Sequence, residues 1–386
     1  MKRWNLAAQL DALKRQQLYR TRQIVGGPQG PQLVIDGTSF DNFSSNDYLG
    51  LANHPEVIAA FQKAASEYGV GSGSAHLICG HSSEHHALEE ELAEFTGRER
   101  ALVFSTGYMA NMGVISALVT KGDAIFQDKL NHASLIDGAR LSGAELKRYS
   151  HNDLDRLQQL LQQSSSDKKL IITDGVFSMD GDEADVKRLA SLAAEHDAAL
   201  MIDDAHGVGV LGGTGAGLLE QHGLNQQQVP ILMATLGKGL GTAGAFVAGS
   251  DALIETLIQR ARTYIFTTAM PPAIMAATRV SLSLCQQEDW RREKLVSLVS
   301  RFRHGAQQLG LNLMSSKTPI QPVVLGSNQA VVSMAAYLKD KGFLVGAIRH
   351  PTVAKSSERL RITLSATHTE SQVDSLLSAL EGAMRD

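Results

Sequence analysis

The sequence predicts an α/β protein, with a large domain around a mostly parallel sheet and a smaller α+β domain after it. From Ala101 onward, short apolar strands, glycine-containing loops and helices follow one another in a repeated order. The chain has 35 glycines among 386 residues, and they gather in loops after apolar runs, as expected where strand ends line one crevice. After Pro272, a long helical stretch passes Trp290 and leads into further strands and helices. We therefore divide the chain into an N-terminal arm and hairpin (1–45), a large domain (46–287) and a small C-terminal domain (288–386).

Composition excludes several classes of protein. The formal net charge of −4 shows no basic excess, which argues against nucleic acid as a partner. No run reaches the roughly 18 apolar residues of a membrane span, and the first residues lack an apolar signal core, so we expect no membrane association and a cytoplasmic location. Cys79 and Cys285 are too far apart in sequence to form a metal-type pair or a disulfide framework.

The N-terminal segment predicts an arm and a hairpin. Leu6, Leu10 and Leu13 recur at helical spacing, which predicts an amphipathic helix over the first twenty residues. Asp36-Gly37 favours a tight turn between two short strands. In the polar loop that follows, Asn46 can reach a ligand, although such a residue more often forms a turn.

A possible zinc motif lies just before the helix predicted over 87–95. Residues 81–85 read His-Ser-Ser-Glu-His, which matches the H-x-x-E-H pattern. We reject this zinc site, because Ser82 or Ser83 is the expected helix N-cap and leaves His81 outside the helix.

In the repeated part, each predicted strand runs into a loop with polar side chains. The strand and loop pairs are 101–104 with 105–108, 124–126 with 128–132, 170–173 with 174–181, 199–202 with 203–206, and 231–234 with 235–241. Because the carboxyl ends of parallel strands meet at one edge of a sheet, these loops are expected to form one site.

Lys238 lies alone between Gly237 and Gly239 in the last of these loops. Glycine neighbours leave room for a ligand to approach the amine and allow the chain a positive φ, which suits a lysine that forms a covalent bond. The alternative is a tight turn with an incidental surface lysine.

Two glycine strings, 207–212 and 239–244, match the G-x-G-x-x-G pattern of nicotinamide and flavin enzymes. A dinucleotide site needs these glycines to open a helix. Neither does, because more glycines follow the first string and the strand-like run 245–248 follows the second. A nicotinamide dehydrogenase and a cofactor-free binding protein remain the competing classes.

The polar residues of these loops match the requirements of pyridoxal phosphate (PLP). This cofactor needs a covalent lysine, an acid for its pyridine nitrogen, an anion site for its phosphate and a group that stacks on its ring. The chain offers these in Lys238, Asp203, the helix start at Gly107-Tyr108, and His132.

In the small domain, the strand 359–364 has an apolar face and a polar face that carries Arg359, Arg361 and Thr363. These arginines need an anion or solvent, and solvent is the usual partner of strand arginines. Arg361 is the candidate for a substrate carboxylate, because a guanidinium meets a carboxylate with two hydrogen bonds.

Nearly the whole chain resembles the α-oxoamine synthases, fold-type I PLP enzymes that condense an amino acid with an acyl thioester. The matching segments are 42–50, 131–134, 175–182, 203–207, 235–239 and 349–353. The similarity is greatest to the members that act in biotin synthesis. It implies the decarboxylative condensation of L-alanine with a pimeloyl thioester to 8-amino-7-oxononanoate, carbon dioxide and free thiol. The alternative is a glycine C-acetyltransferase of the same family, and the thioester carrier is either coenzyme A or an acyl carrier protein.

The resemblance also implies roles for individual residues. Lys238 binds PLP covalently, Asp203 pairs with its pyridine nitrogen, and His132 stacks on its ring. The further implied PLP contacts are Gly107, Tyr108, Ser178, His206, Thr235 and, from a second subunit, Thr268. The implied substrate contacts are Arg20, Asn46, His132, Thr352 and Arg361. A shared site implies an obligate homodimer. Residues 74–76 depart from the pattern of many relatives, so no substrate role is carried over to them.

Overall fold

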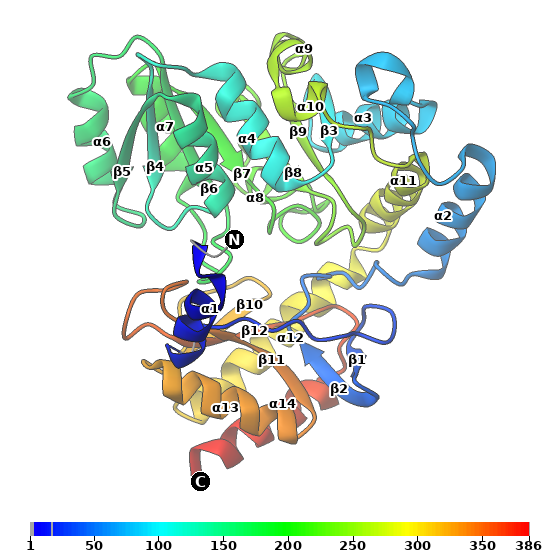
Figure 1. Cartoon of the computed structure of the whole chain (residues 1–386), viewed down its shortest axis with the longest axis vertical. Helices are drawn as coiled ribbons and strands as arrows, with labels where there is room; N and C mark the ends of the chain where they lie inside the picture. Colours follow the sequence, from blue (N-terminus) through cyan, green and yellow to red (C-terminus); the bar gives the residue numbers. More distant parts are fainter. Residues whose placement is uncertain (1–3, 17, 386) are drawn as a thin grey trace.

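The computed structural model describes residues 4–16 and 18–385 and contains two β-sheets (Figure 1). The larger sheet has seven strands in the order β3-β9-β8-β7-β6-β4-β5, and the smaller has five in the order β1-β2-β11-β12-β10. The predicted α/β class is confirmed.

The seven-stranded sheet is parallel except at β9, which runs antiparallel to both of its neighbours. Its strands are β3 (Arg100–Phe104), β4 (Ala124–Asp128), β5 (Glu145–Tyr149), β6 (Lys169–Asp174), β7 (Ala199–Asp203), β8 (Ile231–Thr235) and β9 (Ala245–Gly249). The central strands are buried along their length because helices cover both faces, which explains why they read as apolar runs without alternation.

Helices of the large part pack on the two faces of this sheet. They are α2 (Pro55–Tyr68), α3 (Ser83–Phe95), α4 (Gly107–Leu118), α5 (Ala133–Ser142), α6 (Leu154–Gln162), α7 (Val186–Glu195), α8 (Leu218–Gln221), α9 (Asp251–Arg260), α10 (Arg262–Ile265) and α11 (Pro272–Gln287). In β6, Leu170 and Ile172 pack with α4, α5 and α9, whereas Ile171 packs with α6 and α7 on the other face. This sandwich fixes the strand ends that carry the site.

The glycine loop expected over 69–80 ends in a π-helical turn, η2 (His76–Gly80), which the sequence analysis missed. The turn requires glycine at its last position, because a Cβ on Gly80 would lie 2.1 Å from the carbonyl oxygen of Ser74. A close backbone approach of this kind leaves no periodic pattern in the sequence.

The smaller sheet joins the two ends of the chain. It contains β1 (Gln32–Ile35), β2 (Thr38–Phe43), β10 (Ile320–Val324), β11 (Phe343–Ile348) and β12 (Arg359–Thr363), covered by α12 (Trp290–Gln308), α13 (Asn328–Asp340) and α14 (Glu370–Arg385). The predicted hairpin is confirmed, with Asp36 and Gly37 at φ values of 49° and 80°, and β2 pairs in parallel with β11. The division proposed at 287/288 falls at the break between α11 and α12 and stays a prediction.

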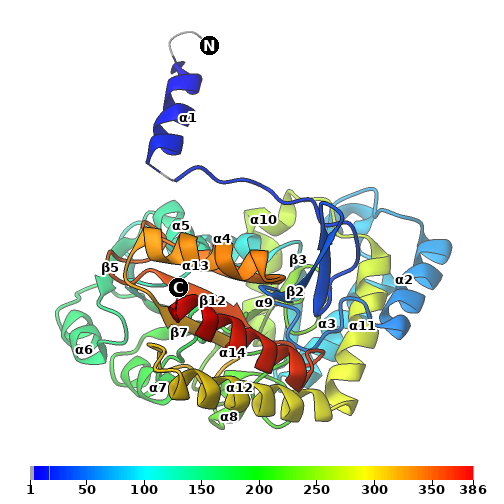
Figure 2. The ribbon, with the colours of Figure 1, turned by 90° about the horizontal axis from the view of Figure 1, so that it is seen from below.

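The arm helix α1 (Leu6–Arg15) stands away from the rest of the molecule (Figure 2). The helix expected over the first twenty residues is longer than α1, which ends at Arg15. Residues 1–3 and 17 of the expected range lie outside the described residues. None of the residues of α1 is buried, so no packing against the rest of the protein stabilises further helical turns. Of the helices described, none is both long enough and apolar enough to cross a lipid bilayer.

Candidate active site

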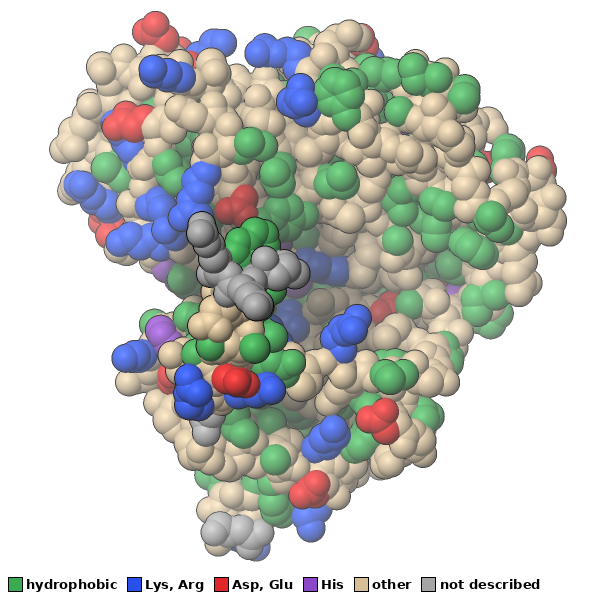
Figure 3. All heavy atoms as spheres, in the orientation of Figure 1, with side chains coloured by type: hydrophobic (Ala, Val, Ile, Leu, Met, Phe, Trp, Pro, Cys, Tyr) green, Lys and Arg blue, Asp and Glu red, His purple; other side chains and the backbone are tan. Residues whose placement is uncertain are grey.

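The loops that follow β4, β6, β7 and β8 meet at one edge of the large sheet, as expected for parallel strands. Of the predicted residues, Asp203 ends β7, and His206 and Lys238 lie in the loops after β7 and β8. The face of the molecule in Figure 3 is hollowed between the halves that carry the two sheets, and Lys and Arg side chains lie in the hollow. Anionic groups are therefore the natural ligands of this cleft.

Lys238 is the first member of a chain of hydrogen bonds. Its Nζ lies 2.8 Å from Nε2 of His206, and Nδ1 of His206 lies 2.7 Å from the hydroxyl of Tyr48. The Tyr48 hydroxyl donates to Oδ1 of Asn46 at 3.2 Å, and Arg361 Nη2 donates to the same oxygen at 3.1 Å. The amine of Lys238 is thus connected to the guanidinium of Arg361 through three side chains.

Burial sets the protonation of the first two groups. It lowers the pKa of Lys238 to about 8, although the nearby carboxylates of Asp203 and Asp174 oppose this shift. Burial, together with the positive charge of Lys238, places the pKa of His206 well below its usual range. His206 is therefore neutral at pH 7 and accepts a hydrogen bond from the ammonium of Lys238.

Asp203 is buried and held at both oxygens. Oδ2 accepts a hydrogen bond from Nδ2 of Asn111 at 2.7 Å, and Oδ1 accepts one from the amide of Ala205 at 3.1 Å. Asn111 comes from α4 and also donates to Ser134 Oγ at 2.9 Å. The sequence analysis missed Asn111, although a lone amide within the apolar run of α4 is a signal that could have revealed it.

His132 caps the N-terminus of α5 and keeps its ring exposed in the cleft. Its amide donates to Oδ2 of Asp174 at 2.6 Å, and its Nδ1 lies 2.7 Å from Ser134 Oγ. Desolvation lowers the pKa of His132, and the charge of Lys238 adds to this while Asp203 opposes it. A neutral, open imidazole with a fixed backbone is suited to lie against a planar ligand.

The start of α4 offers an anion site. Thr106 caps this helix, and the amides of Gly107 and Tyr108 stand in its first turn, where helical N–H groups have no acceptor in their own helix. The Tyr108 ring lies edge-on to His132, with centroids 6.2 Å apart. A phosphate group bound at this helix start would lie close to the His132 ring.

Glycine beside Lys238 is required for space. A Cβ on Gly239 would lie 2.4 Å from the carbonyl oxygen of Val208, so only glycine fits there. The expected positive φ is found at Gly241 and Gly244 instead of at Gly237 and Gly239. The glycines next to the lysine thus serve close packing, and those after it make the turn into β9.

Of three further predicted contacts, Ser178 and Thr235 lie at this centre and Thr268 does not. Ser178 accepts a hydrogen bond at its carbonyl from Nε of Arg361 at 2.6 Å. Thr235, at the end of β8, donates from Oγ1 to the carbonyl of Gly244 at 3.0 Å. Thr268 is exposed and pairs with Ala75 of the glycine loop, so within one chain it lies among neighbours other than the lysine loop.

Solvent is not the partner of the strand arginines, because Arg359 and Arg361 are only 5% and 8% exposed. Arg359 forms an ion pair with Asp180. Among the described residues, no carboxylate lies within ion-pair distance of Arg361, whose partners are neutral oxygens. Arg361 is therefore a buried cation that can accept a carboxylate from a ligand.

Arg20 and Thr352 are brought together at a separate part of the cleft. They line a cavity of about 680 Å³ between α1 with the segment that follows it and residues 347–352, which form the end of β11 and the loop after it. Both side chains are exposed to this cavity, which has room for an extended ligand.

The residues present fit PLP. A buried lysine amine, a buried carboxylate held at both oxygens, an open imidazole and a helix N-terminus meet at one strand edge. These are the four groups that the cofactor requires.

Comparisons with known proteins agree with this chemistry. Residues 39–380 match the model of the family described as aminotransferase class I and II. The chain is 59% identical to an 8-amino-7-oxononanoate synthase of Cellvibrio japonicus over 98% of this chain and 95% of that relative. Among solved structures, a serine palmitoyltransferase from S. paucimobilis with bound PLP has a TM-score of 0.93 at 31% identity, covering 98% of this chain and 96% of that one. An 8-amino-7-oxononanoate synthase from Francisella tularensis has a TM-score of 0.79 at 32% identity, covering 90% of this chain and 98% of that one.

Proposed function

Since the chain belongs to the aminotransferase class I and II family, we propose that it is a PLP-dependent acyltransferase of biotin synthesis. It condenses L-alanine with a pimeloyl thioester and releases carbon dioxide and free thiol to give 8-amino-7-oxononanoate. The identity of 59% over almost the whole chain confirms the family resemblance inferred from the sequence segments.

The observation that carries the proposal is the buried amine of Lys238 beside Asp203 and His206, with a pKa of about 8. An amine of this pKa is partly unprotonated near neutral pH, as covalent attachment to a carbonyl requires. We assign Lys238 to covalent binding of PLP, Asp203 to its pyridine nitrogen and His132 to its ring face. The remaining assigned contacts are Gly107, Tyr108 and Thr235 on the phosphate side, and Ser178 and His206 on the side of the phenolic oxygen.

Bound PLP supplies an electron sink for the negative charge that develops at the α-carbon of the amino acid. The residues of the chain position the reactants and move the proton. Arg361, with Asn46, holds the carboxylate of alanine, and Lys238 removes the α-proton as a general base. We also assign His132 to donate a hydrogen bond to the thioester oxygen as charge develops there. Arg20 and Thr352 contact the acyl substrate along the cavity between the arm and loop 347–352.

A matrix of amino acids and thioesters tests the substrate assignment. Alanine, glycine and serine are each assayed with pimeloyl, acetyl and succinyl thioesters, and alanine with the pimeloyl donor is expected to give the highest kcat/KM. A preference for glycine with a short donor would instead favour the glycine C-acetyltransferase alternative. Running the matrix with both coenzyme A and acyl carrier protein donors identifies the carrier. The proposed place of the reaction is the cytoplasm.

A further inference from the structure

The H-x-x-E-H motif at residues 81–85 does not bind metal through its two named histidines. Ser82 caps α3, and its amide donates to Nδ1 of His85 at 3.2 Å. Nε2 of His85 donates to the carbonyl oxygen of Met270 at 2.9 Å. Both ring nitrogens of His85 are therefore used in the fold, so His85 has no free lone pair for a metal ion.

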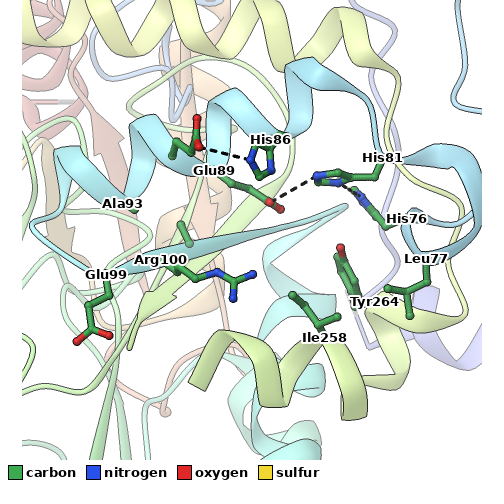
Figure 4. A pocket seen from close by; sticks show the side chains of 12 residues that line it. His76, Leu77, His81, His86, Glu89, Ala93, Glu99, Arg100, Ile258 and Tyr264 are labelled. Carbon is green, nitrogen blue, oxygen red and sulfur yellow. Dashed lines mark hydrogen bonds and ion pairs between the residues drawn. The ribbon is translucent and has the colours of Figure 1, made fainter. Parts of the chain in front are cut away.

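His86, the next residue in the chain, belongs to a different group of possible metal ligands. We propose that His81, His86 and Glu89 form a binding site for one divalent transition-metal ion of the Zn²⁺ type. Their ligand atoms all lie within 4.8 Å of one another, and the carboxylate of Glu89 points toward the two rings (Figure 4). His86 and Glu89 are three residues apart in α3 and so share one face of the helix, while His81 reaches back from just before the cap.

Two of the three ligands are already oriented by other groups. Nδ1 of His81 lies 3.0 Å from Nδ1 of His76, whose ring is stacked on Tyr264. This contact leaves Nε2 of His81 facing Oε2 of Glu89 at 3.9 Å. The other oxygen of Glu89, Oε1, accepts a hydrogen bond from the amide of Val103 at 2.9 Å. Hydrogen bonds that fix the far atom of each ligand are the usual support of metal sites.

The third ligand has the freedom to complete the site. The His86 side chain is 67% exposed, and its Nε2 makes only a long contact of 3.4 Å with Glu90. The ligand atoms lie within 4.8 Å of one another, so metal binding requires this exposed ring to rotate until all three donors are about 2.0–2.2 Å from the ion. Two imidazoles and one carboxylate form a donor set typical of zinc.

The site opens onto a cavity, which leaves a position for water or another ligand on the ion. The cavity has a volume of about 260 Å³ and is lined on its far side by Arg100 and Tyr264. The guanidinium of Arg100 is itself paired with Asp251 at 2.8 Å and Glu255 at 3.4 Å, so its charge is partly neutralised. Among the residues that the structure describes, no lysine or arginine lies within ion-pair distance of Glu89.

Isothermal titration of the PLP-loaded protein with ZnCl₂ tests the proposal. We expect one site per chain that is lost in His81→Ala, His86→Ala and Glu89→Gln. His76→Ala keeps all three ligands but removes the group that orients His81, so it should weaken binding by about 10-fold to 100-fold. His304→Ala is the matched control, because His304 is also an exposed helical histidine with a partner four residues on, and this variant should bind as the wild type does.

Equal zinc affinity in the wild type and in His86→Ala would overturn the proposal, as would an equal loss in His304→Ala. Because Glu89 is almost buried, the melting temperature of each metal-free variant is measured first. His86 is on the surface, so His86→Ala gives a decision even if Glu89→Gln does not fold. Zinc that binds elsewhere, at the active-site histidines for example, would persist in all of these variants.

Discussion

The Lys238 amine lies beside the neutral imidazole of His206 and near two carboxylates. Burial lowers its pKa to about 8 and so weakens its preference for the charged form. We predict that Lys238→Ala loses the absorbance of lysine-bound PLP, above about 400 nm, and all condensation activity. Lys63→Ala, which changes an exposed lysine of α2, is the control and should keep both. Retention of the band in Lys238→Ala would assign the covalent bond to another amine.

Tyr48 fixes the tautomer of His206. Since the ammonium of Lys238 donates to Nε2, the proton of the neutral ring sits on Nδ1 and is donated to the Tyr48 hydroxyl. We predict that Tyr48→Phe leaves this N–H unsatisfied in a buried site and costs about 1–3 kcal/mol of unfolding free energy. The ¹⁵N chemical shifts of His206 should show a protonated Nδ1 in the wild type, and the Nδ1 shift should change in the variant because its hydrogen-bond acceptor is lost.

Tyr149→Phe is the matched control for this prediction, because Tyr149 is a buried tyrosine of β5 with no contact to His206. It should leave the His206 shifts unchanged. Identical shifts in Tyr48→Phe and the wild type would show that the ring is oriented by other groups.

Arg361 is the third residue whose environment predicts a measurable role. Arg361→Lys keeps the charge but loses the planar fork, so we predict that the KM for alanine rises by about 10-fold to 100-fold while kcat changes less. Steady-state kinetics with alanine varied at saturating thioester measures this split. Arg359→Lys keeps the charge beside Asp180 but loses the guanidinium hydrogen bond to the carbonyl of Ser357, so it should lower stability instead. A KM for alanine that stays constant in Arg361→Lys would place the carboxylate elsewhere.

At the scale of elements, His151 ties the loop after β5 to the end of β4 and to the loop after β6. Burial alone would lower its pKa, but hydrogen bonds to Asp128 and Asp182, at 3.2 Å and 2.8 Å, outweigh burial and raise the pKa to about 10. A group whose pKa is raised in the folded state stabilises the fold fully below its unfolded pKa of about 6.5. That stabilisation is lost as the pH rises toward 10.

We therefore predict that His151→Gln destabilises the protein more at pH 6 than at pH 9.5, as measured by urea unfolding at both values. The glutamine keeps one hydrogen bond but no charge, so the difference between the two pH values isolates the electrostatic part. A stability difference that does not change with pH would show that His151 contributes by packing alone.

The elements differ in how far the sequence predicts them. The strands β7 and β8 are evident in the sequence as short apolar runs, one followed by Asp203 and the other shortly before Lys238. Such runs are continuous because both faces of these strands are buried, so apolar and polar residues do not alternate. The pairing of β2 with β11 could not be predicted, since it joins residues about 300 positions apart and no local sequence pattern indicates it. The candidate site divides in the same way. Asp203, His206 and Lys238 were found as strand-end residues, whereas Tyr48 and Asn111 matter only through contacts made after folding.

At the scale of the whole molecule, the position of Thr268 leads to the proposed homodimer. In one chain Thr268 is exposed and lies beside Ala75, and the contact with PLP that the family resemblance implies for it requires the active site of a second copy. A two-fold dimer then contains two sites, each built from Lys238 of one subunit and Thr268 of the partner subunit.

This arrangement predicts complementation between two inactive variants. Lys238→Ala lacks the covalent lysine, and Thr268→Glu places a negative charge against the cofactor phosphate, so each homodimer should be nearly inactive. In a hybrid dimer, one site contains both substitutions, and the other site contains neither and is intact. Co-expression of the two chains at equal levels should therefore restore about a quarter of the wild-type activity, because half of the dimers are hybrids with one working site. If each site were built from one chain, the mixture would show only the mean of the two variants. Two different affinity tags, one on each chain, allow the hybrid dimers to be purified, which separates that outcome from a failure to form hybrids.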